Sequence, residues 1–164
     1  MPEPRKTEQR EARLLAEWLA LRFPKDTVRT QVRLGSPPIL PHGVELEPGD
    51  RQLLKQFSRW ADALIITPQG VMIVEASVFP EPGIVSQLLL YRALYLEDKD
   101  FDNLRHLPVA MLAVWGFEDQ VLRRIAAEHS VMVEIYAPQW LAGALQARFP
   151  RSPRKTVPVR TPPL

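Results

Sequence analysis

Two acidic residues and a glutamine–tyrosine pair have types and spacing that suit metal-assisted phosphate chemistry. Asp62 and Glu75 lie at the outer ends of two apolar runs, which a Pro68-Gln69-Gly70 segment joins. Gln87 and Tyr91 follow four residues apart, a spacing that places both on one face of a helix. Carboxylate oxygens are the usual protein ligands of Mg²⁺ and Mn²⁺, which also bind phosphate oxygens. The pattern therefore predicts a divalent-metal site for phosphodiester chemistry.

The two apolar runs, residues 61–67 and 71–76, predict a β-hairpin. Counted from the turn, Asp62 and Glu75 lie opposite each other on the two strands. Runs that are apolar on both faces belong at the centre of a sheet covered by helices. An acid at a strand end usually meets solvent, but two acids in apolar surroundings are costly unless paired or metal-bound. We therefore expect the two carboxylates to lie close together.

The rest of the sequence predicts an α/β fold with a mixed central sheet flanked by helices. Patterns of apolar residues and turn signals separate the elements, and residues 35–49 predict an irregular segment with four prolines. Helices are expected over 7–22, 50–58, 83–96, 117–129 and 138–148, and strands over 28–34, 61–67, 71–76, 108–115 and 131–136.

The motifs, in their order, resemble those of the PD-(D/E)xK nuclease superfamily, specifically its RecB-like branch. That branch has an acid on one hairpin strand, a (D/E)xK motif on the next and QxxxY on the following helix. This chain has Asp62, then Glu75-Ala76-Ser77, then Gln87 and Tyr91. The resemblance covers roughly residues 8–136. It implies a restriction-endonuclease-like core (helix-strand-strand-strand-helix-strand) with an additional helix-strand-helix, and Mg²⁺- or Mn²⁺-dependent hydrolysis of DNA.

The resemblance also implies a role for each motif residue. Asp62 and Glu75 would be metal ligands, together with the Ala76 carbonyl. Gln87 would support the site, and Tyr91 would contact the scissile strand or orient neighbouring groups. An acid of the first predicted helix often joins the site in this branch, and the chain offers two candidates there: Glu11 and Glu17.

Ser77 departs from the motif, because it occupies the position of the family lysine. That lysine is a cation beside the attacking water and the phosphate, and serine cannot supply its charge. In one interpretation another residue provides the cation, with three candidates: Arg92, Arg59 and Lys55. In the other, the chain is a catalytically inactive nuclease-fold protein. It would then serve as a DNA-binding or structural component, for example in the assembly of a phage or mobile element.

A basic, proline-rich tail of residues 148–164 follows a nuclease-like domain that we assign to residues 1–147. Its five basic residues have no acidic neighbours, whereas the first 147 residues contain 16 basic and 19 acidic side chains. Such a tail is expected to be extended. It would contact DNA phosphates, dock a protein partner or a second copy, or merely add solubility. The basic residues are Arg148, Arg151, Arg154, Lys155 and Arg160.

Composition excludes several other classes of site. The chain has no cysteine, so it has no disulfide or thiolate chemistry, and its three histidines lack the spacing of zinc ligands. Without a membrane-length apolar stretch or an apolar leader, we expect no membrane association and a cytoplasmic or virion location. The four tryptophans mostly fall in apolar patterns, which predicts core positions rather than base-stacking ones.

Overall fold

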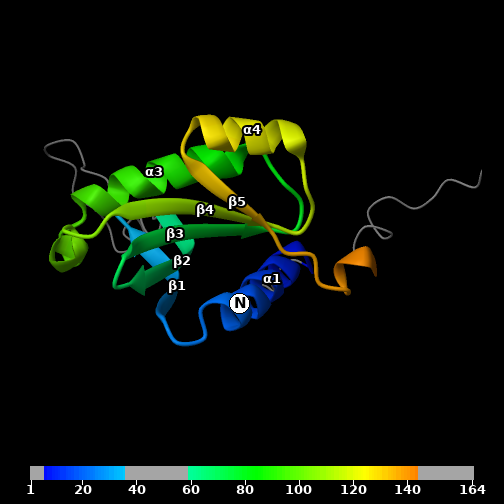
Figure 1. The fold of residues 1–164 in the computed structure, drawn as a ribbon, viewed down its shortest axis with the longest axis horizontal. Coiled ribbons are helices and arrows are strands. Elements are labelled where there is room, and N and C mark those ends of the chain that lie inside the picture. Colours follow the sequence, from blue (N-terminus) through cyan, green and yellow to red (C-terminus); the bar gives the residue numbers. More distant parts are fainter. Residues whose placement is uncertain (1–5, 36–58, 144–164) are drawn as a thin grey trace, which may run out of the picture.

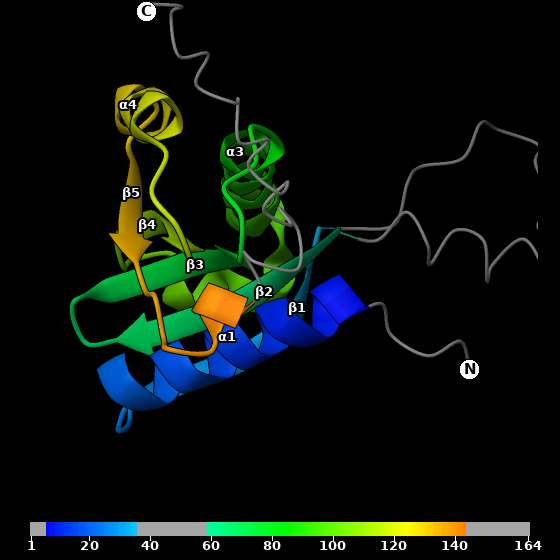
Figure 2. The same ribbon diagram turned by 90° about the vertical axis from the view of Figure 1, so that its right-hand side faces the viewer.

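A five-stranded mixed sheet lies between two helical layers in the computed structural model, which describes residues 6–35 and 59–143 (Figure 1). Helix α1 covers one face, and α3 and α4 cover the other, as the second view makes clear (Figure 2). The predicted fold class is confirmed. The elements are α1 (Lys6–Arg22), β1 (Thr27–Leu34), β2 (Arg59–Thr67), β3 (Gly70–Ser77), α3 (Gly83–Glu97), a 3₁₀ helix η1 (Lys99–Leu104), β4 (Val109–Trp115), α4 (Gln120–Glu128) and β5 (Val131–Ile135).

The strands follow the order β1-β2-β3-β4-β5 across the sheet. The pairs β1–β2 and β2–β3 are antiparallel, whereas β3–β4 and β4–β5 are parallel. A two-residue turn joins β2 to β3, and Thr67 pairs with Gly70 across it. A Cβ atom at Gly70 would lie 2.7 Å from the Pro108 carbonyl oxygen, so this position requires glycine. The predicted hairpin is therefore present in the expected register.

Each face of the sheet has its own apolar core. On the α1 face, Trp18 and its neighbours on the helix pack against Ala63, Ile65 and Val74. On the other face, Leu88 of α3 and Leu122 of α4 pack in a larger cluster with side chains of β2, β3 and β4. Burial on both faces explains why the central strands read as continuous apolar runs.

Most predicted elements match the structure to within about two residues. The helix predicted over 117–129 is shorter, because Asp119 caps it at its start. Of the helix predicted over 138–148, residues 138–143 are described, and helical backbone begins only at Leu141. The irregular segment, the helix predicted over 50–58 and the basic tail lie outside the described residues. The helix η1 was not predicted.

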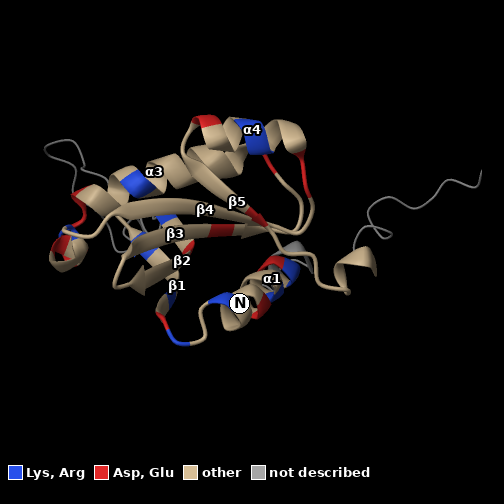
Figure 3. Cartoon of the chain, in the orientation of Figure 1, with Lys and Arg blue, Asp and Glu red and all other residues tan. Residues whose placement is uncertain are grey.

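Charged residues occur on all the helices, and acidic and basic residues intermix on α1 and on α4, so neither helix carries charge of one sign (Figure 3). Within residues 6–35 and 59–143, no helix is both long and apolar enough to cross a membrane.

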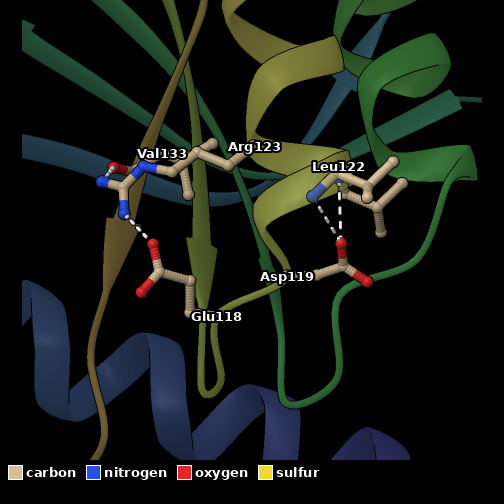
Figure 4. Close-up of polar contacts among 6 residues, drawn as sticks. Glu118, Asp119, Leu122, Arg123 and Val133 are labelled. Atoms are coloured by element: carbon tan, nitrogen blue, oxygen red, sulfur yellow. Dashed lines mark hydrogen bonds and ion pairs between the residues drawn. The ribbon is translucent and has the colours of Figure 1, made fainter.

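Asp119 caps the start of α4, and Arg123 connects the helix to the edge strand β5 (Figure 4). The Asp119 carboxylate accepts hydrogen bonds from the backbone N–H groups of Val121 and Leu122, at 2.9 and 3.0 Å. Arg123 forms an ion pair with Glu118 at 2.6 Å and also donates to the Val133 carbonyl at 3.3 Å. Because that carbonyl belongs to β5, the arginine occupies part of the sheet edge and disfavours pairing with another strand.

Substitution of Asp119 tests its role as the N-terminal cap of α4. Asp119→Ala leaves two N–H groups of the first turn without an acceptor, and we expect a loss of about 1 kcal/mol in the free energy of unfolding. Asp119→Asn keeps an acceptor oxygen and should cost much less. Urea denaturation of the three proteins measures the difference, and equal stability of the alanine and asparagine variants would contradict the assigned cap.

Candidate functional site

The strands β2 and β3 separate at Asp62, and the two predicted acids lie in the resulting fork. The β2–β3 ladder runs from the turn to the pair Ala63–Val74 and ends there. Beyond that point β2 stays paired with β1, while β3 continues along β4 as far as Ser77. The register places Asp62 opposite Glu75, as the sequence predicted, but one step past the last backbone pair.

Both acids accept backbone hydrogen bonds across the fork. The Asp62 N–H donates to the Glu75 carboxylate at 3.1 Å, and the Ala76 N–H donates to the Asp62 carboxylate at 2.9 Å. These side-chain acceptors take the place of ladder carbonyls, so neither N–H is left unpaired. The reciprocal bonds hold the two carboxyl groups next to each other.

Both acids of the pair ionise less readily than free carboxyl groups. Burial, followed by repulsion from Asp62, raises the pKa of Glu75 from 4.5 to about 8, and the charge of Glu11 adds to this. Burial also raises the pKa of Asp62, against the effect of its hydrogen bond from Ala76. With a pKa of about 8, Glu75 is mostly protonated at pH 7, and a divalent cation would have to displace that proton.

The two candidate acids of α1 have different surroundings. Glu11 lies near the pair, because its charge raises the pKa of Glu75 and its carboxylate oxygen is 3.3 Å from Ser77 Oγ. Glu17 instead binds Trp140 Nε1 at 2.9 Å and Arg13 at 2.8 Å, contacts that lower the pKa of Glu17. The structure thus places Glu11, and not Glu17, at the site.

Ser77 is buried at the end of β3, with only 4% of its surface exposed. Its hydroxyl donates to the Phe79 carbonyl at 2.6 Å, a shorter contact than the one to Glu11. The serine therefore stabilises the loop after β3 and places no positive charge beside the acids.

Tyr91 lies beside the acid pair. Burial, and then the charges of Glu75 and Asp62, raise its pKa to about 12, while Arg59 acts in the opposite direction. The phenol therefore stays protonated and remains a hydrogen-bond donor at all physiological pH values. The effect of Arg59 on Tyr91 also shows that this arginine lies near the site.

The structure does not place Gln87 or Arg92 in contact with Asp62 or Glu75. Gln87 is exposed one turn before Tyr91, and within the described part of the chain it makes no hydrogen bond to either acid. Arg92 is exposed on α3. Lys55 and the basic residues of the tail lie outside the described residues.

An unusual backbone conformation at Gln31 accompanies the fork. Gln31 stands opposite Asp62 between β1 and β2, has φ = 51°, and is missing from the otherwise continuous ladder. Before this residue Val28 packs in the α1 core, whereas after it Val32 and Leu34 pack in the α3 core. Regular alternation would put all three on one side. The strand therefore changes faces at Gln31, which the alternating sequence did not predict.

A neighbouring switch occurs on β2. Ala63 and Ile65 pack in the α1 core, but Ala61 packs in the α3 core. Asp62 lies where β2 changes faces. It stands opposite Glu75 and also lines a hollow on the α1 side of the sheet. The hollow has a volume of about 600 Å³; α1 lines it with apolar side chains and with Gln9 and Glu11, and β1 lines it with Thr30 and Gln31. Water or a dissolved ion can reach Asp62 through this hollow.

The donor set fits an open magnesium or manganese site better than a closed one. Residues 6–35 and 59–143 contain no group of three or more His, Cys, Asp or Glu arranged to hold a metal. Mg²⁺, however, is commonly bound by one or two carboxylates and completed by water and substrate phosphate. Asp62 and Glu75, adjacent and directed by backbone N–H groups, meet that smaller requirement.

Comparison with known proteins gives distant structural likenesses only. No protein-family model matches the chain, and no curated protein matches it. A crystal structure of a repair endonuclease from Pyrococcus abyssi is similar, with a TM-score of 0.46 and 11% identity, over 84% of this chain and 50% of that one. A protein of unknown function, AF1548, gives a TM-score of 0.39 and 10% identity, over 74% and 52% of the two chains. The chain spans about half the length of each.

The raised pKa of Glu75 predicts a specific pH dependence of stability. Its pKa is about 8 in the folded state against 4.5 as the reference, so the folded state retains a proton that the unfolded state loses between these values. Stability contributed by this group therefore declines as pH rises from about 4.5 to 8. Glu75→Gln keeps the acceptor and donates an N–H to Asp62, so it should stabilise the metal-free protein at pH 9 by on the order of 3 kcal/mol.

Urea unfolding at pH 5, 7 and 9 measures this effect. The matched control, Glu97→Gln, removes an exposed acid of α3 and should leave the pH profile unchanged. Parallel profiles for wild type and Glu75→Gln would show that Glu75 is ionised in the folded protein at neutral pH.

Proposed function

We propose that the protein is a metal-dependent nuclease that hydrolyses DNA phosphodiesters with Mg²⁺ or Mn²⁺. The observation that carries the proposal is the Asp62–Glu75 pair, held by backbone N–H groups where β2 leaves β3. Buried acids with raised pKa values are more typical of functional sites than of structural ones. The motif resemblance points to the same chemistry.

Asp62 and Glu75 would hold the ion once Glu75 loses its proton. A bound ion would supply an activated water and neutralise charge on the phosphate. Because ligand binding competes with the proton on Glu75, metal affinity should increase as pH rises towards 8. The protonated Tyr91 hydroxyl would donate to a phosphate oxygen, and Glu11 would accept from a metal-bound or free water. Arg59 would offset the negative charge that develops on the phosphate.

An alternative function has its own support. Ser77 directs its hydroxyl into the loop after β3, and the described residues hold no third acid within a metal-binding group. A chain with these features would keep the fold as a DNA-binding or assembly component without hydrolysing DNA. Metal binding and cleavage must therefore be measured separately.

The nuclease proposal predicts that both acids are indispensable. With Mn²⁺ and labelled single- and double-stranded DNA, Asp62→Ala and Glu75→Ala should each reduce the cleavage rate by more than about 100-fold. Glu97→Gln is the control. Mn²⁺ should also raise the melting temperature of the wild type but not of the two alanine variants.

The combined results separate the two functions. A rise in melting temperature without cleavage would favour the non-catalytic alternative. Neither cleavage nor any change in melting temperature with metal would overturn the metal site itself.

Arg59 is the cation that we expect to replace the motif lysine. Arg59→Ala should reduce kcat by on the order of 100-fold, and Arg59→Lys should restore part of it because the charge is kept. Arg92→Ala, on the exposed side of α3, should leave kcat nearly unchanged. Single-turnover cleavage assays distinguish the two arginines, and a larger loss for Arg92→Ala would reverse the assignment.

A further inference from the structure

One tryptophan contradicts the expectation that the tryptophans occupy core positions. Trp18 and Trp115 are completely buried, but 47% of the Trp60 side chain and backbone surface is exposed. Trp60 lies on β2, two residues before Asp62, which corresponds to about 7 Å along a strand. Arg33 of β1 is its direct cross-strand partner. A large aromatic surface and a cation therefore lie side by side next to the acid pair.

The change of faces at Gln31 and Asp62 determines where these two side chains point. Ala61 packs in the α3 core, so its neighbour Trp60 lies on the α1 face of the sheet. Arg33 lies between Val32 and Leu34, which also pack in the α3 core, so it shares that face. The hollow that reaches Asp62 is bounded by α1 and β1 on the same face.

The two arginines of this region, Arg33 and Arg59, form no direct ion pair with any residue that the structure describes. The ion pairs among the described residues involve Arg13, Arg22, Arg105 and Arg123. An exposed cation next to an exposed aromatic ring is complementary to a phosphate linked to a flat, apolar base. A protein partner would need a broader apolar surface than a single tryptophan provides.

We propose that Trp60 and Arg33 bind one unpaired nucleotide of a single-stranded nucleic acid beside the Asp62–Glu75 pair. The base stacks on Trp60, and Arg33 contacts the adjoining phosphate. Stacking requires a base outside a duplex, and every base has a face that can stack. The site therefore selects single-stranded segments without selecting a sequence. As a substrate class this rests on the proposed nuclease function, but the binding itself does not require cleavage.

The test measures binding without metal, so that cleavage plays no part. Anisotropy of a fluorescent 12-nucleotide oligo(dT), in EDTA, reports the affinity of the full chain. Trp60→Ala should weaken binding about 10- to 100-fold, and Trp60→Phe should retain most of the affinity. Arg33→Ala should weaken binding and reduce the slope of log affinity against log salt by about 0.7.

Matched controls are available at the far edge of the sheet, on β5 and α4, away from β1 and β2. Met132 of β5 is 46% exposed and Arg124 of α4 is exposed, so Met132→Ala and Arg124→Ala should leave oligo(dT) affinity unchanged. A labelled duplex of the same length should bind wild type and Trp60→Ala equally. Because Trp60 is half-exposed, its replacement should preserve the melting temperature.

The outcomes separate this proposal from the nuclease function. Tight oligo(dT) binding that depends on Trp60 supports the proposal even if no cleavage is found. Equal affinity of wild type and Trp60→Ala overturns it, even if Asp62 and Glu75 are required for cleavage. Self-association that Trp60→Ala abolishes, with no binding of oligo(dT), would also overturn it and identify a protein contact instead.

Discussion

The backbone N–H groups at the fork between β2 and β3 need acceptors, and the rest of the site depends on how they obtain them. Where two strands separate, ladder hydrogen bonds are lost, and buried N–H groups left unpaired are costly. The carboxylates of Asp62 and Glu75 accept two of these bonds. The same contacts fix the position of both acids on the strands themselves. The consequence is electrostatic: burial, and then repulsion from the neighbouring Asp62, raises the pKa of Glu75 to about 8.

The left-handed backbone conformation at Gln31 occurs directly opposite Asp62, at the fork between β2 and β3. A non-glycine residue with φ = 51° is strained by roughly 1–3 kcal/mol, and it persists only where surrounding structure compensates. Here the compensation is burial, since the change of faces allows Val28 to pack under α1 and Leu34 to pack under α3. A regular strand would put both side chains on the same face of the sheet. The change of faces also exposes Asp62 to the hollow beside α1 while it remains bonded to Ala76.

The sequence predicted what depends on local pattern and not what depends on tertiary contact. Continuous apolar runs and a short turn were enough to predict the hairpin, and counting from the turn placed Asp62 opposite Glu75. The choice between Glu11 and Glu17 could not be made, because it depends on the rotation of α1 against the sheet. Gln31 gave no signal, since a glutamine in an alternating strand does not indicate φ > 0. The prediction of a core position for Trp60 was wrong. Trp60 adjoins the apolar run of β2, but β2 changes faces at Asp62, and Trp60 lies beyond that point on an exposed part of the α1 face.

The charges around the fork favour a particular order of binding. Asp62, Glu75 and Glu11 bring negative potential to the site, and Ser77 adds no cation to oppose it. A lysine at position 77 would lie against Glu11 and neutralise part of this charge, so its absence makes the acids attract a cation more strongly and a phosphate less. A nucleic acid approaching the metal-free site would be repelled by the pair. In the proposed function its affinity would therefore have to come from groups outside the pair, namely Arg59, Arg33 and the exposed ring of Trp60. A metal ion would have to occupy the pair before a phosphate could lie against the acids.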